Sequence, residues 1–225
     1  MEKKKETLIG ISQPALRRMP LYYRCLLQAL EKNITVISSE ELGQTANVNS
    51  ALVRQDLSCL PKLGRPGIGY DARSLASQLE ELLGLVNDKE AVLVGVGHLG
   101  YSLALYPGFA PYRLQIIALF DNDPNKVGQL VAERRILAME KLPSLVKRLH
   151  IQMGIITVPA TAAQAVVEIM IDAGIKMVWN FAPCRLTVPD GVLVKNEDLA
   201  ASLAAFSCQI TQSKIAMQQG GKTIR

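Results

Sequence analysis

The chain has 225 residues, of which 49% are hydrophobic and 20% are charged. This balance suits one or two globular domains with real hydrophobic cores and excludes extensive disorder. The polar start, residues 1–7, lacks the apolar core of a signal peptide. The most apolar stretch, residues 91–109, is interrupted by glycines, a histidine and a proline, which excludes a membrane span. We therefore expect a cytoplasmic protein with no membrane partner.

The cysteines and the distribution of charge limit the metal sites and the binding partners that the protein can have. The four cysteines form no CxxC pair, so zinc is disfavoured, no metal site is predicted, and the thiols are expected to be reduced and buried. The formal net charge is +5, and residues 1–75, with 11 basic and 7 acidic side chains, carry +4 of it. This excess of base is compatible with phosphate contacts, and equally with a plain basic surface.

The N-terminal third predicts short helices. Residues 22–30 have an apolar face of helical spacing, with Pro20 near the expected start, where proline is tolerated. Ser38 and Glu41 form a capping box, in which the hydroxyl accepts a backbone N–H and the carboxylate reaches back to the cap. A second helix is therefore expected from there to about Ala46.

The next segment has the pattern of a helix-turn-helix. Residues 47–49 form a turn, and Asn49 is a good N-cap for a helix with an inner stripe of Val53, Leu57 and Leu60. The residues left facing outward are Ser50, Ala51, Arg54, Gln55 and Ser58. Two short helices joined by a tight turn, with small and hydrogen-bonding residues outward on the second, are typical of a DNA-reading motif.

The outward residues suit contacts with double-stranded DNA. Arg54 and Gln55 can form bidentate hydrogen bonds with purine edges, and the small residues allow close approach. Residues 61–70 are rich in glycine and proline and carry two cations, which indicates a β-hairpin wing against phosphates or a minor groove. The alternative is a solvated helix face followed by a plain loop. The DNA-binding candidates are Asn49, Ser50, Ala51, Arg54, Gln55, Ser58, Lys62 and Arg65.

A second domain is expected after a boundary near residues 86–88. A buried-type strand over residues 91–94 leads into GxGxxG at Gly95–Gly100, then a helix, a second strand over residues 114–120, and Asp121. In this order the glycines let the backbone approach a pyrophosphate at the helix N-terminus, and the Asp accepts the ribose hydroxyls. Asp121 would repel a 2′-phosphate, which favours NAD(H) over NADP(H). The alternative is that the glycines serve packing only.

The alternation of strands and helices continues to the C-terminal segment. Strands are expected over residues 151–158, 175–180 and 192–194, and a helix over residues 160–173. A last helix is expected from Asp198 to about Ile210. Because Leu199, Leu203 and Phe206 align on it, this helix needs a partner surface, either on its own domain or on a second subunit.

These residues together resemble the Rex family of redox-sensing transcriptional repressors, over nearly the whole chain. The segments that carry the resemblance are 21–24, 38–42, 53–58, 67–70, 95–100, 106–109, 123–128, 157–160 and 180–183. The resemblance implies a homodimer that exchanges its C-terminal helices, binds operator DNA with NAD+ and releases it when NADH binds. It also implies a coupling network of Arg24, Tyr106 and Asp198. The chain departs from the family at Gln55, usually Lys, and within the wing.

The expected fold class is α/β: an N-terminal winged-helix domain, a Rossmann-like doubly wound parallel sheet and a C-terminal swapped helix. The expected domains are residues 1–85 for DNA binding, 86–196 for NAD(H) binding, and 197–225 for the exchanged helix and tail. The cofactor-binding candidates, including those that only the resemblance implies, are Gly95, Val96, Gly97, His98, Leu99, Gly100, Asp121, Thr157, Val158, Pro159 and Asn180.

Three alternatives remain at this point. An NAD-dependent oxidoreductase with an accessory N-terminal domain would need an acid–base group, but His98 lies in the expected phosphate loop, His150 precedes a strand, and no catalytic constellation stands out. We therefore predict no catalytic residues and no enzyme. A CoA-like nucleotide could replace NAD(H), although Asp121 argues for a free ribose. A DNA-binding protein with a vestigial nucleotide site is the third alternative.

Overall fold

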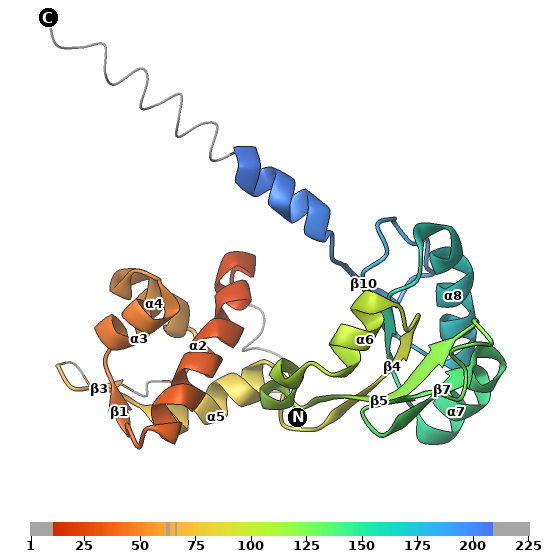
Figure 1. Cartoon of the computed structure of the whole chain (residues 1–225). Coiled ribbons are helices and arrows are strands. Elements are labelled where there is room, and N and C mark those ends of the chain that lie inside the picture. Colours follow the sequence, from red (N-terminus) through yellow and green to blue (C-terminus); the bar gives the residue numbers. More distant parts are fainter. Residues whose placement is uncertain (1–10, 62–63, 66, 209–225) are drawn as a thin grey trace, which may run out of the picture. The chain divides into compact units, whose positions relative to one another are not determined.

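The computed structural model describes residues 11–61, 64–65 and 67–208, which fall into two compact units. The first unit comprises Met1–Asp88 together with Pro111–Arg113, and the second comprises Lys89–Ala110 together with Leu114–Arg225. Each unit is described by itself (Figure 1).

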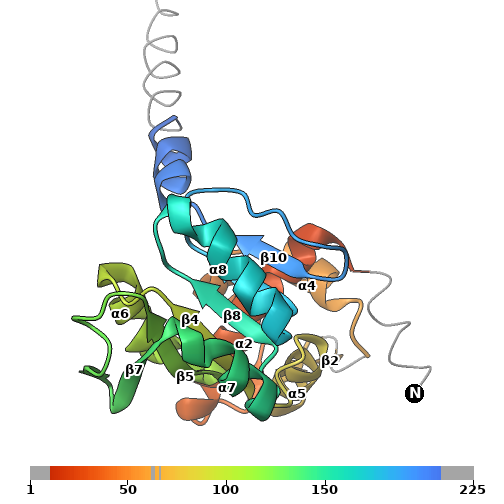
Figure 2. The same ribbon diagram turned by 90° about the vertical axis from the view of Figure 1, so that its right-hand side faces the viewer.

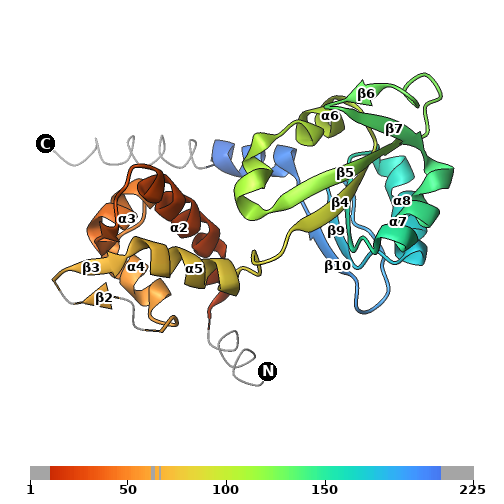
Figure 3. The same cartoon turned by 90° about the horizontal axis from the view of Figure 1, so that it is seen from below.

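The first unit is mainly helical. Its elements are α2 (Gln13–Glu31), β1 (Val36–Ile37), α3 (Ser39–Ala46), α4 (Ser50–Leu57), β2 (Gly64–Arg65), β3 (Gly69–Asp71) and α5 (Ala72–Leu82). The strands form a three-stranded antiparallel sheet in the order β1-β3-β2, with β2 and β3 as a hairpin beside the helices (Figure 3). A buried core that includes Met19, Leu42, Val53 and Leu75 joins α2, α3, α4 and α5.

Local capping explains where these helices begin. The Ser38 hydroxyl accepts from the Glu41 N–H at 3.1 Å, and the Glu41 carboxylate accepts from the Ser38 N–H at 2.7 Å, which confirms the predicted capping box. The Asn49 side chain accepts from the Ala51 N–H at 2.8 Å and caps α4 as expected. This helix ends at Leu57, three residues before the expected Leu60.

The prediction for α2 was wrong at its start. The helix begins at Gln13 behind the Ser12 cap, so Pro20 lies inside it rather than near its beginning. The fully buried Met19 and Tyr22 flank this proline on the inner face. Burial of these two large side chains stabilises the helix across a residue that lacks one backbone donor.

A buried carboxylate joins α4 to α2. Asp56 accepts from Arg18 through both of its oxygens, Oδ2 from Nε at 2.6 Å and Oδ1 from Nη2 at 2.7 Å, and Oδ2 also accepts from the Tyr22 hydroxyl at 2.7 Å. Burial raises the pKa of Asp56, but the hydrogen bonds from Arg18 and Tyr22 outweigh it and hold that pKa below its usual value. No role for Asp56 was predicted from the sequence.

The second unit is built on one seven-stranded sheet. Its elements are β4 (Lys89–Val94), α6 (His98–Ala104), β5 (Leu114–Asp121), β6 (Leu130–Val131), β7 (Arg134–Ala138), η2 (Met139–Lys141), α7 (Leu142–Leu149), β8 (Met153–Ile156), α8 (Ala160–Ala173), β9 (Met177–Asn180) and β10 (Leu193–Asn196). The 3-10 helix η1 (Pro107–Tyr112) begins in this unit and ends in the first. The strand order is β10-β9-β8-β4-β5-β7-β6, parallel except for the antiparallel pair β6–β7 (Figure 2).

Helices cover both faces of this sheet. On one face α7 and α8 pack against Val92, Val94 and Phe120, and on the other face α6 packs near Leu93 and Leu119 (Figure 1). Alternate residues of β4 and β5 therefore enter different cores, which is why these strands are almost continuously apolar. No helix or strand was predicted for residues 130–149, which form β6, β7 and α7 in the structure.

Three residues that follow α6 along the chain, Pro111–Arg113, belong to the first unit. The Tyr112 hydroxyl donates to the Pro20 carbonyl oxygen at 3.3 Å, and Arg113 Nη2 lies 3.0 Å from Glu80 Oε1. The chain therefore returns to the first unit between α6 and β5.

The C-terminal segment is helical from Leu199 to Cys208, where the described residues end. The Asp198 carboxylate accepts from the Ala201 N–H at 2.8 Å and caps this helix. Leu199, Leu203 and Phe206 are 64%, 69% and 59% exposed. The end of the predicted helix near Ile210 lies outside the described residues.

The four cysteines are free. Cys25 is buried as expected, whereas Cys59 and Cys184 are partly exposed and Cys208 is exposed, so the expectation of buried thiols was wrong for these three. No helix of the described residues is long and apolar enough to cross a membrane.

Replacement of Asp56 by Asn should lower the free energy of unfolding by about 3 kcal/mol at pH 7, because it removes one partner of a buried ion pair. The carboxylate has a lowered pKa in the folded state, so its stabilisation is present above the unfolded-state pKa near 4 and is lost as the pH falls through the folded value. The difference between wild type and variant should therefore shrink towards pH 2.

Denaturant unfolding at several pH values measures this difference. Glu31→Gln, at an exposed acid of the same unit, is the control and should leave the stability nearly unchanged. An equal deficit of Asp56→Asn at pH 7 and pH 2 would show that the Asp56 charge is not the stabilising feature.

Candidate nucleotide-binding site and nucleic-acid interface

A cavity of about 730 Å³ lies at the carboxyl ends of β4, β5 and β8. Because β5 pairs with one side of β4 and β8 with the other, the chain connections diverge at this point, where open parallel sheets bind ligands. The cavity is lined by Val94, Gly95, Gly97, Asp121, Asn122, Asp123, Lys126, Met139, Thr157, Val158, Pro159, Ala162, Ala165, Val166 and Ile169.

The glycine-rich turn between β4 and α6 depends on two glycines for different reasons. Gly95 has φ +96°, a conformation that glycine adopts without strain. A Cβ on Gly100 would lie 2.0 Å from the Gly95 carbonyl oxygen, so α6 packs against the turn as only glycine allows. A Cβ on Gly97, by contrast, would meet no heavy atom within 4 Å, which leaves open space beside the start of α6.

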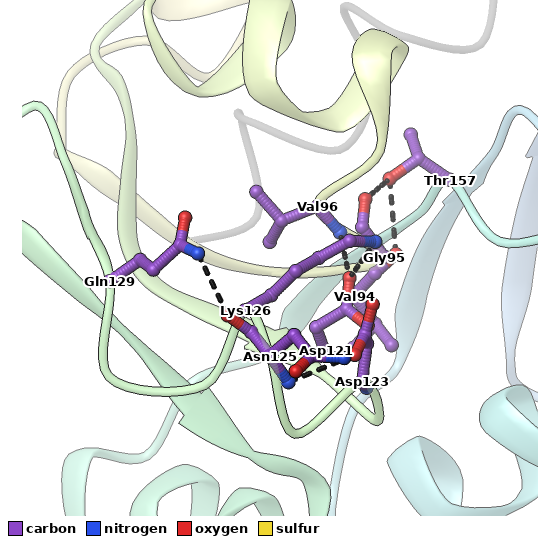
Figure 4. A network of polar contacts seen from close by, with 9 residues as sticks. All are labelled: Val94, Gly95, Val96, Asp121, Asp123, Asn125, Lys126, Gln129 and Thr157. Carbon is purple, nitrogen blue, oxygen red and sulfur yellow. Dashed lines mark hydrogen bonds and ion pairs between the residues drawn. The ribbon is translucent and has the colours of Figure 1, made fainter.

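Asp121 ends β5 and is 5% exposed. Its Oδ2 accepts from the Val96 N–H at 2.8 Å and from Lys126 Nζ at 3.1 Å, and its Oδ1 accepts from the Asp123 N–H at 2.9 Å (Figure 4). Burial raises the pKa of Asp121, but the donors Asp123, Lys126 and Val96 outweigh it and hold the pKa below its usual value. The cavity therefore contains an acceptor that is ionised at neutral pH.

Thr157 fixes the turn from the other side. Its hydroxyl lies 2.7 Å from the Gly95 carbonyl oxygen and 3.0 Å from the Val94 carbonyl oxygen (Figure 4). Of the cofactor candidates, Gly95, Gly97, Asp121 and the segment 157–159 line the cavity together.

The other cofactor candidates do not line this cavity. Asn180 is fully buried and bonded within its own loop, for example from Nδ2 to the Cys184 carbonyl oxygen at 3.0 Å. The Val96 N–H donates to Asp121. The remaining candidates, His98, Leu99 and Gly100, lie at the start of α6.

The lining residues that follow Asp121 and those on α8 were not predicted from the sequence. Asn122, Asp123 and Lys126 come directly after the ribose candidate, so their position in the chain was an available signal. The apolar face of α8, including Val166 and Ile169, was not separable from core residues by periodicity alone.

The first unit presents the predicted DNA-binding residues on α4. Asn49, Ala51, Arg54, Gln55 and Ser58 are exposed. Arg54 Nη1 donates to Ser39 Oγ at 2.9 Å and lies 3.2 Å from Glu40 Oε1, so it is held against α3 in this structure. Ser50 is half-buried and Arg65 lies in β2, whereas Lys62 lies outside the described residues.

The residues of the predicted coupling network lie in different units. Arg24 is exposed on α2 in the first unit, and Tyr106 and Asp198 belong to the second. Tyr106 is 55% exposed and packs edge-on against Phe109, with ring centroids 5.0 Å apart. The coupling itself stays a prediction.

No group of three or more His, Cys, Asp or Glu residues that could hold a metal ion occurs within the part of the chain that the structure describes.

Two family models match the chain, one in each half. A model described as putative DNA-binding protein N-terminus matches residues 10–58, and one described as CoA binding domain matches residues 86–184. Together with the folds, these matches define a protein with an N-terminal DNA-binding helical domain and a Rossmann-like α/β domain.

Three curated relatives named redox-sensing transcriptional repressor Rex are similar over most of the chain. The one from Roseiflexus sp. is 39% identical over 85% of this chain and 87% of its own. The relative from Clostridium botulinum is 36% identical over 95% of this chain and 100% of its own. The relative from Chloroflexus aurantiacus is 38% identical over 88% of this chain and 94% of its own. The chain belongs to the Rex family. Since these relatives are repressors rather than enzymes, the predicted regulatory role is confirmed.

Solved structures agree with this assignment. The crystal structure of RSP in complex with β-NAD+ and operator DNA superposes with a TM-score of 0.83 at 31% identity, covering 95% of this chain and 99% of RSP. RSP in complex with β-NADH gives 0.80 at 30% identity, covering 93% and 99%. RSP is described as a Rex-family repressor.

Gly97, at the N-cap of α6, and Gly100, within α6, should respond differently to replacement by alanine. Gly97→Ala should leave the melting temperature unchanged, since its Cβ meets open space, but should weaken NADH binding at least about tenfold by filling the space where a pyrophosphate approaches. Gly100→Ala should destabilise the fold by about 1–3 kcal/mol, because its Cβ clashes with a backbone carbonyl.

Thermal unfolding and NADH titration of both variants measure this contrast, and each variant is the other's control. Wild-type NADH affinity in Gly97→Ala would refute the phosphate-binding role of this turn.

Proposed function

We propose that this protein represses transcription by binding operator DNA through its first unit, and that NADH binding to its second unit releases the DNA. The observation that carries the proposal is the buried, ionised Asp121 beside the glycine-rich turn in a cavity of about 730 Å³. Such a carboxylate suits the hydroxyls of an adenosine ribose. The RSP structures with NAD+ and NADH support the choice of cofactors.

In the proposed nucleotide complex the pyrophosphate lies over the turn and the first residues of α6, and the ribose lies at Asp121. Met139, Val166 and Ile169 supply an apolar wall that suits an adenine ring. Asn180 acts by holding the loop that follows β9. The remaining proposed contacts are Gly95, Val96, Gly97, His98, Leu99, Gly100, Thr157, Val158 and Pro159.

In the proposed DNA complex the first unit acts as a winged helix, with α4 in the major groove and the β2–β3 hairpin as the wing. Arg54 and Gln55 read base edges, while Asn49, Ser50, Ala51 and Ser58 approach the backbone. Arg54 must exchange Ser39 and Glu40 for a base, since both now hold it. Lys62 and Arg65 of the wing complete the proposed interface.

The proposed assembly is a cytoplasmic homodimer that exchanges its C-terminal helices. It divides each chain into a DNA-binding domain (1–85), a doubly wound nucleotide-binding domain (86–196) and a dimerisation segment (197–225). The support is the exposed apolar row of Leu199, Leu203 and Phe206, which extends from the sheet without a covering surface among the described residues. Arg24, Tyr106 and Asp198 would couple the two ligand sites across this dimer.

Fluorescence anisotropy of labelled DNA from the protein's own promoter region tests the central proposal. We expect tight binding alone or with NAD+, and release at micromolar NADH. DNA binding that is indifferent to both nucleotides would refute redox sensing. Because the second half matches a family model described as CoA binding, CoA is titrated in parallel. Release by CoA but not NADH would replace the cofactor assignment.

Asp121→Ala and Arg54→Ala should separate the two ligand sites. Asp121→Ala should weaken NADH binding at least about tenfold, because a charge-assisted acceptor is lost, and should leave DNA affinity without nucleotide unchanged. Arg54→Ala should weaken operator binding by about 1–3 kcal/mol and leave NADH affinity unchanged. Calorimetric NADH titration and DNA anisotropy check both variants. Equal NADH affinity in Asp121→Ala would remove the ribose assignment.

Phe206→Glu should shift the protein towards the monomer, because it places a charge in the apolar row that we propose to be buried between subunits. Ala201→Glu is the control, since the 100° spacing of successive residues puts it on the opposite side of the helix. Sedimentation velocity measures the assembly state. A dimer in Phe206→Glu that is as stable as in the control would exclude this face from the interface.

A further inference from the structure

We propose that Lys126 sets the nucleotide selectivity of this site, by competing with the adenosine ribose for Asp121 and by offering a cation to a 2′-phosphate. The inference rests on the proposed NAD(H) site and assigns a role to a residue within it. Lys126 lines the cavity with its side chain 36% exposed, and its Nζ lies 3.1 Å from Asp121 Oδ2 (Figure 4).

The number of hydrogen bonds that Asp121 can accept limits which donors it can bind at the same time. A carboxylate offers about four acceptor positions. Three are already used, by the backbone N–H groups of Val96 and Asp123 and by the Lys126 ammonium. A ribose with free 2′- and 3′-hydroxyls donates two hydrogen bonds, so one of the present donors must leave when the ribose docks.

Lys126 is the donor that can leave. The N–H of Val96 lies in the glycine-rich turn. The preceding residue, Gly95, is anchored there because its own N–H donates to the Phe120 carbonyl oxygen at 2.8 Å. The N–H of Asp123 opens a turn in which the Asp123 carbonyl oxygen accepts from the Lys126 N–H at 3.0 Å. Both backbone donors are therefore fixed, whereas a lysine ammonium rotates on a flexible four-carbon stem.

Lys126 also changes the net charge of the cavity wall. The charged residues that line the described cavity are Asp121, Asp123 and Lys126, which sum to −1. Without the lysine the same wall would carry −2. A displaced ammonium stays beside the ribose, where it attracts a 2′-phosphate that the two carboxylates repel. The lysine therefore weakens the rejection of NADP(H) that Asp121 alone would impose, and it also weakens NADH binding by occupying its acceptor.

The test is a Lys126→Met variant of the full-length protein, with NADH and NADPH affinities measured by calorimetry. We expect NADH to bind severalfold more tightly and NADPH more weakly, so that the NADH/NADPH selectivity ratio rises at least about tenfold. Lys126→Arg keeps the charge and should keep a ratio close to wild type. Lys147→Met, at an exposed lysine of α7, is the matched control and should change neither affinity.

If the selectivity ratio of Lys126→Met equals the wild-type ratio, the proposal is overturned. This includes the case in which both affinities fall together, because Lys126 would then bind a part of the molecule that NADH and NADPH share. Melting temperatures of the variants confirm that the folds are comparable. Failure of the wild type to bind NADH would instead refute the proposed function, so the two failures are distinguishable.

Asp121→Asn, alone and with Lys126→Met, completes a double-mutant cycle. With a neutral amide at this position, Lys126 loses the charge-assisted hydrogen bond that makes it a competitor of the ribose, so its removal should no longer increase NADH affinity but should still weaken NADPH binding. An unchanged gain in NADH affinity from Lys126→Met in the Asp121→Asn background would also contradict the competition with the ribose.

Discussion

The second unit depends on the close approach of three segments around the Gly95 carbonyl oxygen. The Cα of Gly100 brings α6 against it, and the Thr157 hydroxyl approaches it from the end of β8. This contact sets the direction in which the chain leaves β4, and so it fixes where the Val96 N–H meets Asp121. The floor of the cavity is therefore a consequence of backbone packing, and any larger residue in place of Gly100 would move all of it.

Both units use a buried carboxylate to position a functional helix or turn. Asp56 holds α4 to α2 in the first unit, and Asp121 holds the start of the glycine-rich turn in the second. The two acids differ in what surrounds them. Asp56 is enclosed by side chains of the first unit, whereas Asp121 lines a cavity and has one side-chain donor, Lys126, which lines the same cavity.

The sequence predicted the elements whose signals are local. The capping box at Ser38, the bounds of α8 and the order of strand, glycines and Asp121 follow from short-range chemistry. The role of Asp56 could not be predicted, because Arg54, Gln55 and Asp56 are three consecutive polar residues, and only the packing on α2 shows which one points inward. The strands of the region 130–149 were not predicted because β6 has only two residues and β7 begins with two arginines, so neither shows the apolar run of the buried strands.

The return of Pro111–Arg113 to the first unit has a consequence for how the protein can be divided. The chain crosses between the units at 88/89, at 110/111 and at 113/114, so a single cut cannot separate them. An isolated N-terminal fragment would lack the Tyr112 hydroxyl at Pro20 and the Arg113 guanidinium at Glu80. Chimeras that join this DNA-binding unit to another sensor would therefore have to transplant a discontinuous module, and recombination at one junction would break it.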